Sequence, residues 1–234
     1  MISQEKYNAI EEISALRSEC IDLINSAAAM NLNNSQNEFR IIIPFFYSIW
    51  ERFFRTSNAI VIKIIRSKTY SSNDGLHKRL NAYQIACFLQ KEPFYQTYLD
   101  KNKSFDSVKI KGGIFENLSN FIDKLLKWIH SPLPISVEPE KMVMTFSNVN
   151  KEVVLVNAKS TGMIKLPEFN DFINEIGPIE EFVGIRNDIS HGALIEYISQ
   201  RKFDYLLEFS KKIINGYCHI CQLWIFYNDL YEGD

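Results

Sequence analysis

Arg186 and His191 are the two residues whose types and spacing best suit chemistry on a phosphodiester. An arginine guanidinium keeps its positive charge at physiological pH and can hold a phosphate through two parallel hydrogen bonds. A histidine imidazole titrates near neutrality, so it can accept a proton from one group and donate a proton to another. The pair therefore predicts a site that handles a phosphate group.

The local geometry of this stretch depends on where a helix ends. On a helix, Asn187 and His191 share a face, as do Arg186 and Ser190, because each pair is four residues apart. Arg186 and His191 would point about 140° apart on a straight helix. They converge only if the helix ends near Gly192, a natural helix stop, or if the long arginine reaches round. A histidine in the last turn would also meet the negative end of the helix dipole, which favours its protonated form.

The same residues permit a purely structural interpretation. Arg186 could pair with an acid such as Glu51 or Glu181, while Asp188 and His191 cap a turn. Short motifs of this kind match often by chance. The residues alone leave both interpretations open.

The elements that must position the pair are mainly helical. Apolar residues recur at three- and four-residue steps over residues 3–29, 35–66 and 201–228, and over 166–183 with a glycine–proline interruption. The apolar surface of 35–66 is broad, which predicts a central helix buried on more than one side. Pro44 within it lacks a backbone donor, so we expect a kink or a late start there.

The middle of the chain is predicted to differ from this helical body. Residues 142–158, MVMTFSNVNKEVVLVNA, contain two runs of β-branched and alternating apolar residues around a polar turn. This pattern predicts a β-hairpin. We therefore expect one mainly α domain over residues 1–234, with an irregular insertion at about 91–165 that includes the hairpin.

Composition and charge limit the class of protein. The 234 residues, 46% hydrophobic and 13% aromatic, suit a globular domain with a sizeable core. A net charge of −2 argues against a whole-molecule nucleic-acid clamp but permits a local basic groove. The first residues lack signal-peptide features, and no apolar run reaches the ~18–20 residues of a membrane span. We expect a cytoplasmic protein.

Metal and cofactor sites are not predicted. Cys218 and Cys221 form a C-x2-C pair without a second pair of ligands at suitable spacing, so small core hydrophobes are the better interpretation. Gly112 and Gly113 lack the Lys-Ser/Thr that follows in a phosphate-binding loop. We expect no cofactor and no metal.

Two segments resemble a known superfamily. R-N-D-I-S-H-G (186–192) resembles the R-x4–6-H signature of the HEPN superfamily, including a polar residue directly after the arginine. YSIWERFFR (47–55) resembles the tyrosine–x–x–tryptophan–glutamate segment on the second helix of a bacterial HEPN-like nuclease branch of stand-alone proteins. The resemblance covers roughly residues 1–66 and 165–230.

The resemblance implies an antiparallel helical bundle that forms a homodimer, with two R-x4-H motifs facing each other across a cleft. It also implies metal-independent endoribonuclease activity on RNA, often as a toxin or anti-phage effector with an antitoxin or defence-system partner. By position, Arg186 and His191 would be the catalytic pair, supported by Asn187, Ser190 and Glu51.

One position departs from a branch of that superfamily. Toxins inactivated by nucleotidylation carry a tyrosine two residues after the histidine, where this chain has Ala193. That mode of antitoxin control is therefore not expected. The alternative functions are a non-catalytic HEPN-like module that binds nucleotide or RNA, and a helical interaction protein in which the motif only packs.

Overall fold

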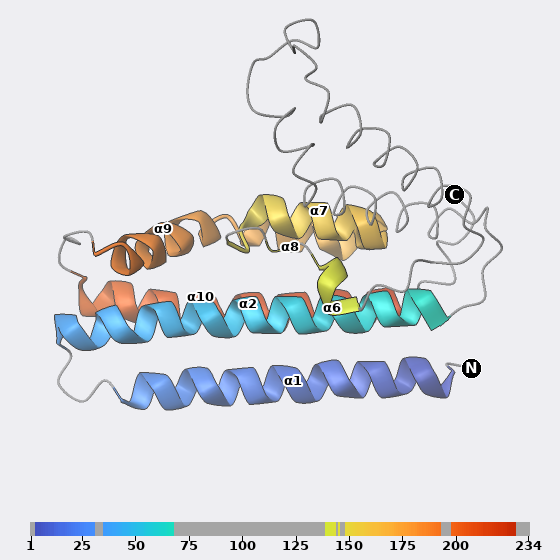
Figure 1. The fold of residues 1–234 in the computed structure, drawn as a ribbon, viewed down its shortest axis with the longest axis horizontal. Helices are drawn as coiled ribbons and strands as arrows, with labels where there is room; N and C mark the ends of the chain where they lie inside the picture. The colour runs from blue at the N-terminus through green and yellow to red at the C-terminus, as the bar shows by residue number, and fades with distance from the viewer. Residues whose placement is uncertain are drawn as a thin grey trace, which may run out of the picture.

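Three long helices form the body of the protein (Figure 1). A computed structural model describes residues 3–30, 35–67, 139–143, 145, 148–192 and 198–227. Within these residues, the long helices α1 (Gln4–Ala29), α2 (Gln36–Ser67) and α10 (Gln200–Tyr227) lie side by side, each packed against the other two. The helical expectation for the three segments is confirmed, with bounds within one or two residues of those predicted.

The directions of the three helices follow from contacts between them. Arg17 and Ser14 of α1 contact Asn215 and Gln222 of α10, so the two helices run in opposite directions. The Gln36 side chain, at the start of α2, bonds both backbone groups of Ile198, just before α10. The helices α2 and α10 therefore begin together and run the same way, antiparallel to α1 (Figure 1).

Local signals account for the helix bounds. Ser3 caps α1, because its hydroxyl accepts a hydrogen bond from the Lys6 amide. The late start expected at Pro44 is wrong, since α2 begins at Gln36 and continues through the proline. The buried side chains on both sides of Pro44, such as Ile43 and Phe46, hold the helix together through that position.

A second layer of short helices covers α2 and α10 (Figure 1). Its members are α6 (Pro139–Met142), α7 (Lys151–Thr161), the 3₁₀ helix η2 (Met163–Lys165), α8 (Pro167–Glu175) and α9 (Ile179–Ser190). The interruption between α8 and α9 falls at the predicted glycine–proline pair. Because α6, α7 and α9 all contact α2, this layer brings the end of α9 against the central helix.

The predicted hairpin at 142–158 is wrong. Residues 151–161 form α7, and Met142 ends α6. The Asn150 side chain accepts from the Val153 amide at 3.0 Å and starts α7, while Gly162 ends it at a φ of 82°. These caps, with burial of one face, outweigh the strand preference of the β-branched residues. The part of the predicted insertion at 91–138 lies outside the described residues.

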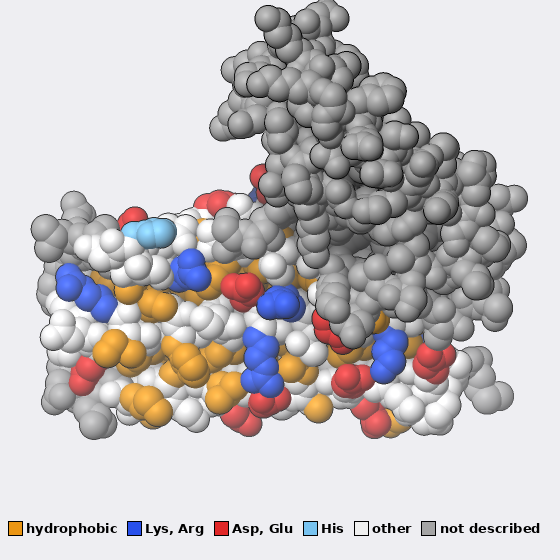
Figure 2. Space-filling view, in the orientation of Figure 1, with side chains coloured by type: hydrophobic (Ala, Val, Ile, Leu, Met, Phe, Trp, Pro, Cys, Tyr) orange, Lys and Arg blue, Asp and Glu red, His pale blue; other side chains and the backbone are white. Residues whose placement is uncertain are grey.

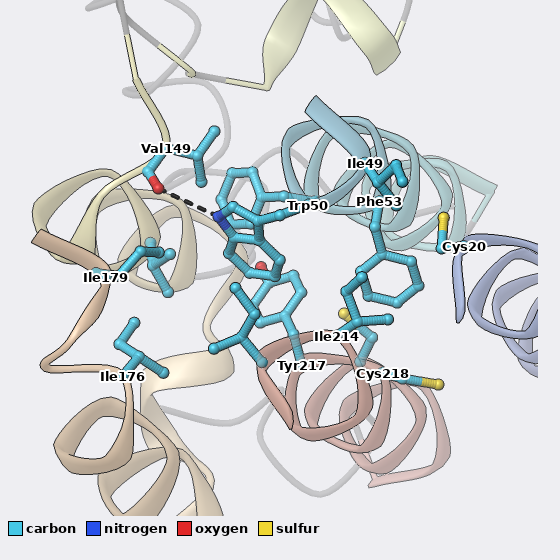
Figure 3. Close-up of a cluster of buried hydrophobic side chains, with 14 of the residues drawn as sticks. Cys20, Ile49, Trp50, Phe53, Val149, Ile176, Ile179, Ile214, Tyr217 and Cys218 are labelled. Atoms are coloured by element: carbon cyan, nitrogen blue, oxygen red, sulfur yellow. Dashed lines mark hydrogen bonds between the residues drawn. The ribbon is translucent and has the colours of Figure 1, made fainter. Parts of the chain in front are cut away.

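The core is rich in aromatic side chains and joins both layers (Figure 3). Trp50 of α2 is fully buried, and its ring meets Tyr217 of α10 edge-on at 5.8 Å between centroids. The Trp50 indole Nε1 donates to the Val149 carbonyl oxygen at 3.2 Å. This hydrogen bond ties the segment that precedes α7 to the centre of α2, which matters for the site described next.

None of the described helices combines the length and apolar character needed to cross a membrane.

Candidate functional site

Arg186 lies in a socket made by three parts of the chain. Its guanidinium Nη1 donates to the Asn187 side-chain oxygen at 2.9 Å and to the Asn148 side-chain oxygen at 3.3 Å. The guanidinium carbon lies over the Tyr47 ring, 5.3 Å from its centroid, within the range of a cation–π contact. Helices α9 and α2 and the segment before α7 therefore fix one partly buried cation.

Tyr47 is itself held firmly. It is fully buried, its ring meets Phe182 of α9 edge-on at 5.7 Å, and its hydroxyl oxygen accepts the Val149 amide. Burial raises the pKa of Tyr47 to about 12, and the Glu51 carboxylate also raises it, while the Val149 hydrogen bond and the Arg186 cation lower it. Tyr47 is therefore a neutral platform beneath Arg186, and it lies within the electrostatic reach of Glu51.

His191 caps the end of α9. Its backbone amide donates to the Asn187 carbonyl at 2.9 Å, and its side chain is exposed. Gly192 follows at a φ of 68°, a left-handed conformation that turns the chain away from the helix axis. Helix α9 thus ends next to Gly192, which is the helix end that we predicted from the spacing of Arg186 and His191.

The interpretation that Arg186 pairs with an acid finds no support among the described residues. Glu181 pairs with Lys202 of α10, and Glu51 lies in a separate pocket on α2. The hydrogen bonds of Arg186 within this part of the chain go to neutral amides. A guanidinium has five N–H donors, so donors remain for an external anion, and its charge is not neutralised by these contacts.

The other residues expected to support the site fall into two groups. The Asn187 side-chain oxygen accepts a hydrogen bond from Arg186, and the Asn187 backbone carbonyl accepts one from the His191 amide. Ser190 is exposed at the last position of α9. Glu51 is partly buried on α2, one helical turn after Tyr47.

Two residues of the socket were not predicted as site residues. Tyr47 falls in the segment that resembles the HEPN-like branch, and its place in that segment is the signal that could have identified it. Asn148 belongs to the polar run interpreted as a hairpin turn, and it lies 38 residues from Arg186 in sequence. No local pattern marks Asn148, because only packing brings it to the arginine.

The cysteines belong to the core. Cys20, Cys218 and Cys221 are buried, and Cys20 and Cys218 are labelled in Figure 3 among apolar side chains. Burial raises the pKa of the Cys20 and Cys218 thiols to about 11. Across the described residues, no three His, Cys, Asp or Glu side chains gather as a metal site would need.

Comparison with known proteins identifies the family. A family model described as HEPN_MAE_28990/-like HEPN matches residues 2–223, nearly the whole chain. No curated protein and no solved structure matches. The match includes both α2 and the end of α9, the two elements that build the Arg186 socket. The chain belongs to the HEPN_MAE_28990-like family of the HEPN superfamily.

Proposed function

We propose that this protein is a metal-independent endoribonuclease in which Arg186 and His191 act on the scissile phosphodiester of RNA. The observation that carries the proposal is the state of Arg186. Its guanidinium is fixed by Tyr47, Asn148 and Asn187, yet within the described residues no carboxylate neutralises it. A fixed, uncompensated cation is what stabilisation of a phosphorane-like transition state requires, and the exposed His191 follows it at the end of the same helix.

Arg186 has the electrostatic role in this reaction. Negative charge accumulates on the non-bridging phosphate oxygens as the nucleophile attacks, and a preorganised guanidinium stabilises that charge without reorganising. The planar fork of donors matches two phosphate oxygens. The amide contacts engage Nη1, so the remaining donors are available to the phosphate.

His191 has the proton-transfer role. The 2′-hydroxyl oxygen attacks phosphorus, and the bond from phosphorus to the 5′-oxygen breaks, leaving a 2′,3′-cyclic phosphate and a 5′-hydroxyl. An imidazole takes the proton from the 2′-hydroxyl, and an imidazolium gives a proton to the leaving 5′-oxygen. The substrate must be RNA, because the nucleophile is its own 2′-hydroxyl.

A homodimer would supply the two histidines that base and acid need. Hydrophobic side chains are exposed along α2 on the face shown in Figure 2. Among the exposed hydrophobic residues of α2 are Ile41 and Phe45, with 74% and 43% of their surfaces exposed. Exposed apolar side chains beside charged groups are typical of protein–protein interfaces. We propose that two copies pair through α2, so that each contributes one Arg186 and one His191 to the site.

The decisive experiment is cleavage of a labelled RNA in the presence of a chelator. Wild-type protein should cleave and leave 2′,3′-cyclic phosphate ends, whereas Arg186→Ala and His191→Ala should lose activity at unchanged melting temperature. Arg201→Ala and His219→Ala are matched controls, since both residues are exposed on α10 and neither is among the residues that hold Arg186. Activity that disappears with the chelator would overturn the metal-independent mechanism.

The same variants test the cellular role and the alternative. We propose that the protein acts as a toxin or anti-phage effector, so induced wild type should stop growth and degrade RNA while His191→Ala does neither. Intact RNA with both proteins, together with RNA binding that depends on Arg186, would favour the non-catalytic binding module.

A further inference from the structure

A polar pocket lies on α2, beyond the Arg186 socket. The cavity has a volume of about 300 Å³. Its lining residues are Ser48, Glu51, Arg52, Arg55, Thr56 and Glu140, of which all but the last belong to α2. Small-molecule pockets begin at about this size, roughly 300–1,000 Å³. The pocket can therefore hold a group of limited size, such as a single ring system.

The pocket lies on the same helix as Tyr47 of the socket. Glu51 lies one turn after Tyr47, and Arg55 lies two turns after it, about 6 and 12 Å along the axis at 1.5 Å per residue. The Glu51 carboxylate and the Arg186 cation both act on the Tyr47 hydroxyl, in opposite directions. Figure 2 shows acidic and basic side chains close together on the face of the molecule that it draws.

The charges of the lining do not suit a second phosphate. Arg52 pairs with Glu19 of α1 at 2.7 Å. The lining then offers the Arg55 guanidinium, two carboxylates from Glu51 and Glu140, and two hydroxyls. A phosphate would meet more negative than positive charge here. A neutral, flat group with both donors and acceptors suits the pocket better, and a nucleobase is such a group.

Among the RNA bases, guanine best matches this set of groups. Its N1–H and N2–H are adjacent donors, which one carboxylate accepts together, and its O6 and N7 are adjacent acceptors, which a guanidinium bonds as a fork. Adenine and cytosine place a donor beside an acceptor on their pairing edges, so a carboxylate would face an acceptor. Uracil has no such pair of donors.

We propose that this pocket is a guanine-recognition subsite, which binds the base of a nucleotide next to the phosphate held by Arg186. Glu51 and Glu140 accept from the base and Arg55 donates to it. The inference rests on the proposed ribonuclease function, and it gives Glu51, expected only as a supporting residue, a role in substrate selection.

The test uses short RNA oligonucleotides that carry one ribose, the other sugars being 2′-deoxy, so that cleavage occurs at one position. The base on each side of that position is guanine, inosine or adenine in turn. The base of inosine, hypoxanthine, is guanine without its N2 amino group. We expect kcat/KM for guanine to exceed that for inosine on one side by about tenfold, a typical difference for the loss of one hydrogen bond to a carboxylate.

Glu140→Gln should bring the guanine-to-inosine ratio close to one, because a carboxylate reads the amino group that inosine lacks. Arg55→Ala should instead lower the inosine-to-adenine ratio, because its guanidinium bonds the O6 that adenine lacks. Each ratio compares kcat/KM for two oligonucleotides with the same variant, so a loss of activity that affects both equally does not change it. Arg201→Ala, outside the pocket, should keep both wild-type ratios. Equal rates for guanine and inosine on both sides, or a preference that the pocket variants leave unchanged, would overturn the proposal.

Failure of the ribonuclease function gives a different result. If wild-type protein cleaves none of the oligonucleotides, their dissociation constants are measured by fluorescence anisotropy. Tighter binding of the guanine oligonucleotide that is lost in Arg55→Ala supports the subsite in a non-catalytic module. Equal binding of all oligonucleotides overturns it.

Discussion

The Arg186 guanidinium lies over the ring of Tyr47, 5.3 Å from its centroid, although the two residues are 139 positions apart in the sequence. The contact joins the central helix α2 to the end of α9. It also places a permanent cation beside a hydroxyl that accepts the Val149 amide. The arginine is thus positioned by the core and does not depend on a surface loop.

The first prediction concerns this positioning. Asn148→Ala removes one of the two amides that hold Nη1 while leaving the ring contact with Tyr47 in place. We expect kcat for RNA cleavage to fall about tenfold, because a guanidinium that must be ordered during the reaction stabilises the transition state less. Initial rates measured over a range of RNA concentrations separate kcat from KM.

Tyr47→Phe complements that measurement. It retains the ring but removes the hydroxyl, leaving the buried Val149 amide without its acceptor. The expected loss of stability is about 1–3 kcal/mol, measured by urea unfolding. Unchanged kcat in Asn148→Ala would contradict the positioning role, even if Tyr47→Phe were destabilised.

The second prediction concerns two helical glycines. A Cβ at Gly216 of α10 would lie 2.9 Å from the Phe172 ring of α8, whereas a Cβ at Gly184 of α9 meets nothing within 4 Å. Gly216→Ala should therefore destabilise by about 1–3 kcal/mol through overpacking. Gly184→Ala should stabilise by about 0.5–1 kcal/mol through helix propensity. Thermal unfolding of both variants measures the contrast, and equal effects would argue against the close α8–α10 packing.

The third prediction concerns the turn after His191. Gly192 has a φ of 68°, where an L-residue with a Cβ is strained by about 1–2 kcal/mol. Gly192→Ala should therefore shift the end of α9. We expect the loss of kcat/KM to exceed the loss that a smaller folded fraction would cause. Gly192→Asn is the control, because asparagine tolerates this conformation better. Equal activity of Gly192→Ala and Gly192→Asn would show that the role of His191 does not depend on the conformation of this turn.

The fourth prediction concerns alkaline pH. Burial raises the pKa of Tyr47 from 10.0 to about 12, and those of Cys20 and Cys218 from 9.0 to about 11. Each raised pKa favours the neutral form in the folded state, so its contribution is complete below the ordinary pKa. That contribution is lost as pH rises towards the folded-state pKa. The free energy of unfolding should therefore decline from about pH 9 to about pH 12.

Urea unfolding at successive pH values measures this decline. Cys20→Ala removes one thiol, so the difference in stability between wild type and this variant should shrink between about pH 9 and 11. A difference that stays constant over that interval would mean that the Cys20 thiol does not ionise with unfolding.

The sequence by itself determined the long helices and the end of α9, and it singled out Arg186 and His191 as candidates. The apolar residues of α1, α2 and α10 recur at helical spacing, and this recurrence is a local property of the chain. Gly192 likewise marks the end of α9 through its own backbone preference. The helix end that the spacing of Arg186 and His191 needs was therefore predictable from the sequence, whereas the chemistry of the pair stays a prediction.

The tertiary structure decided what surrounds that pair. The β-branched residues of α7 suggested a strand, but the Asn150 cap and burial against the helical body select a helix. Asn148 and Tyr47 reach Arg186 from distant segments. No periodic pattern encodes such a contact, because it depends on how whole helices pack and on which side chains that packing leaves opposite one another.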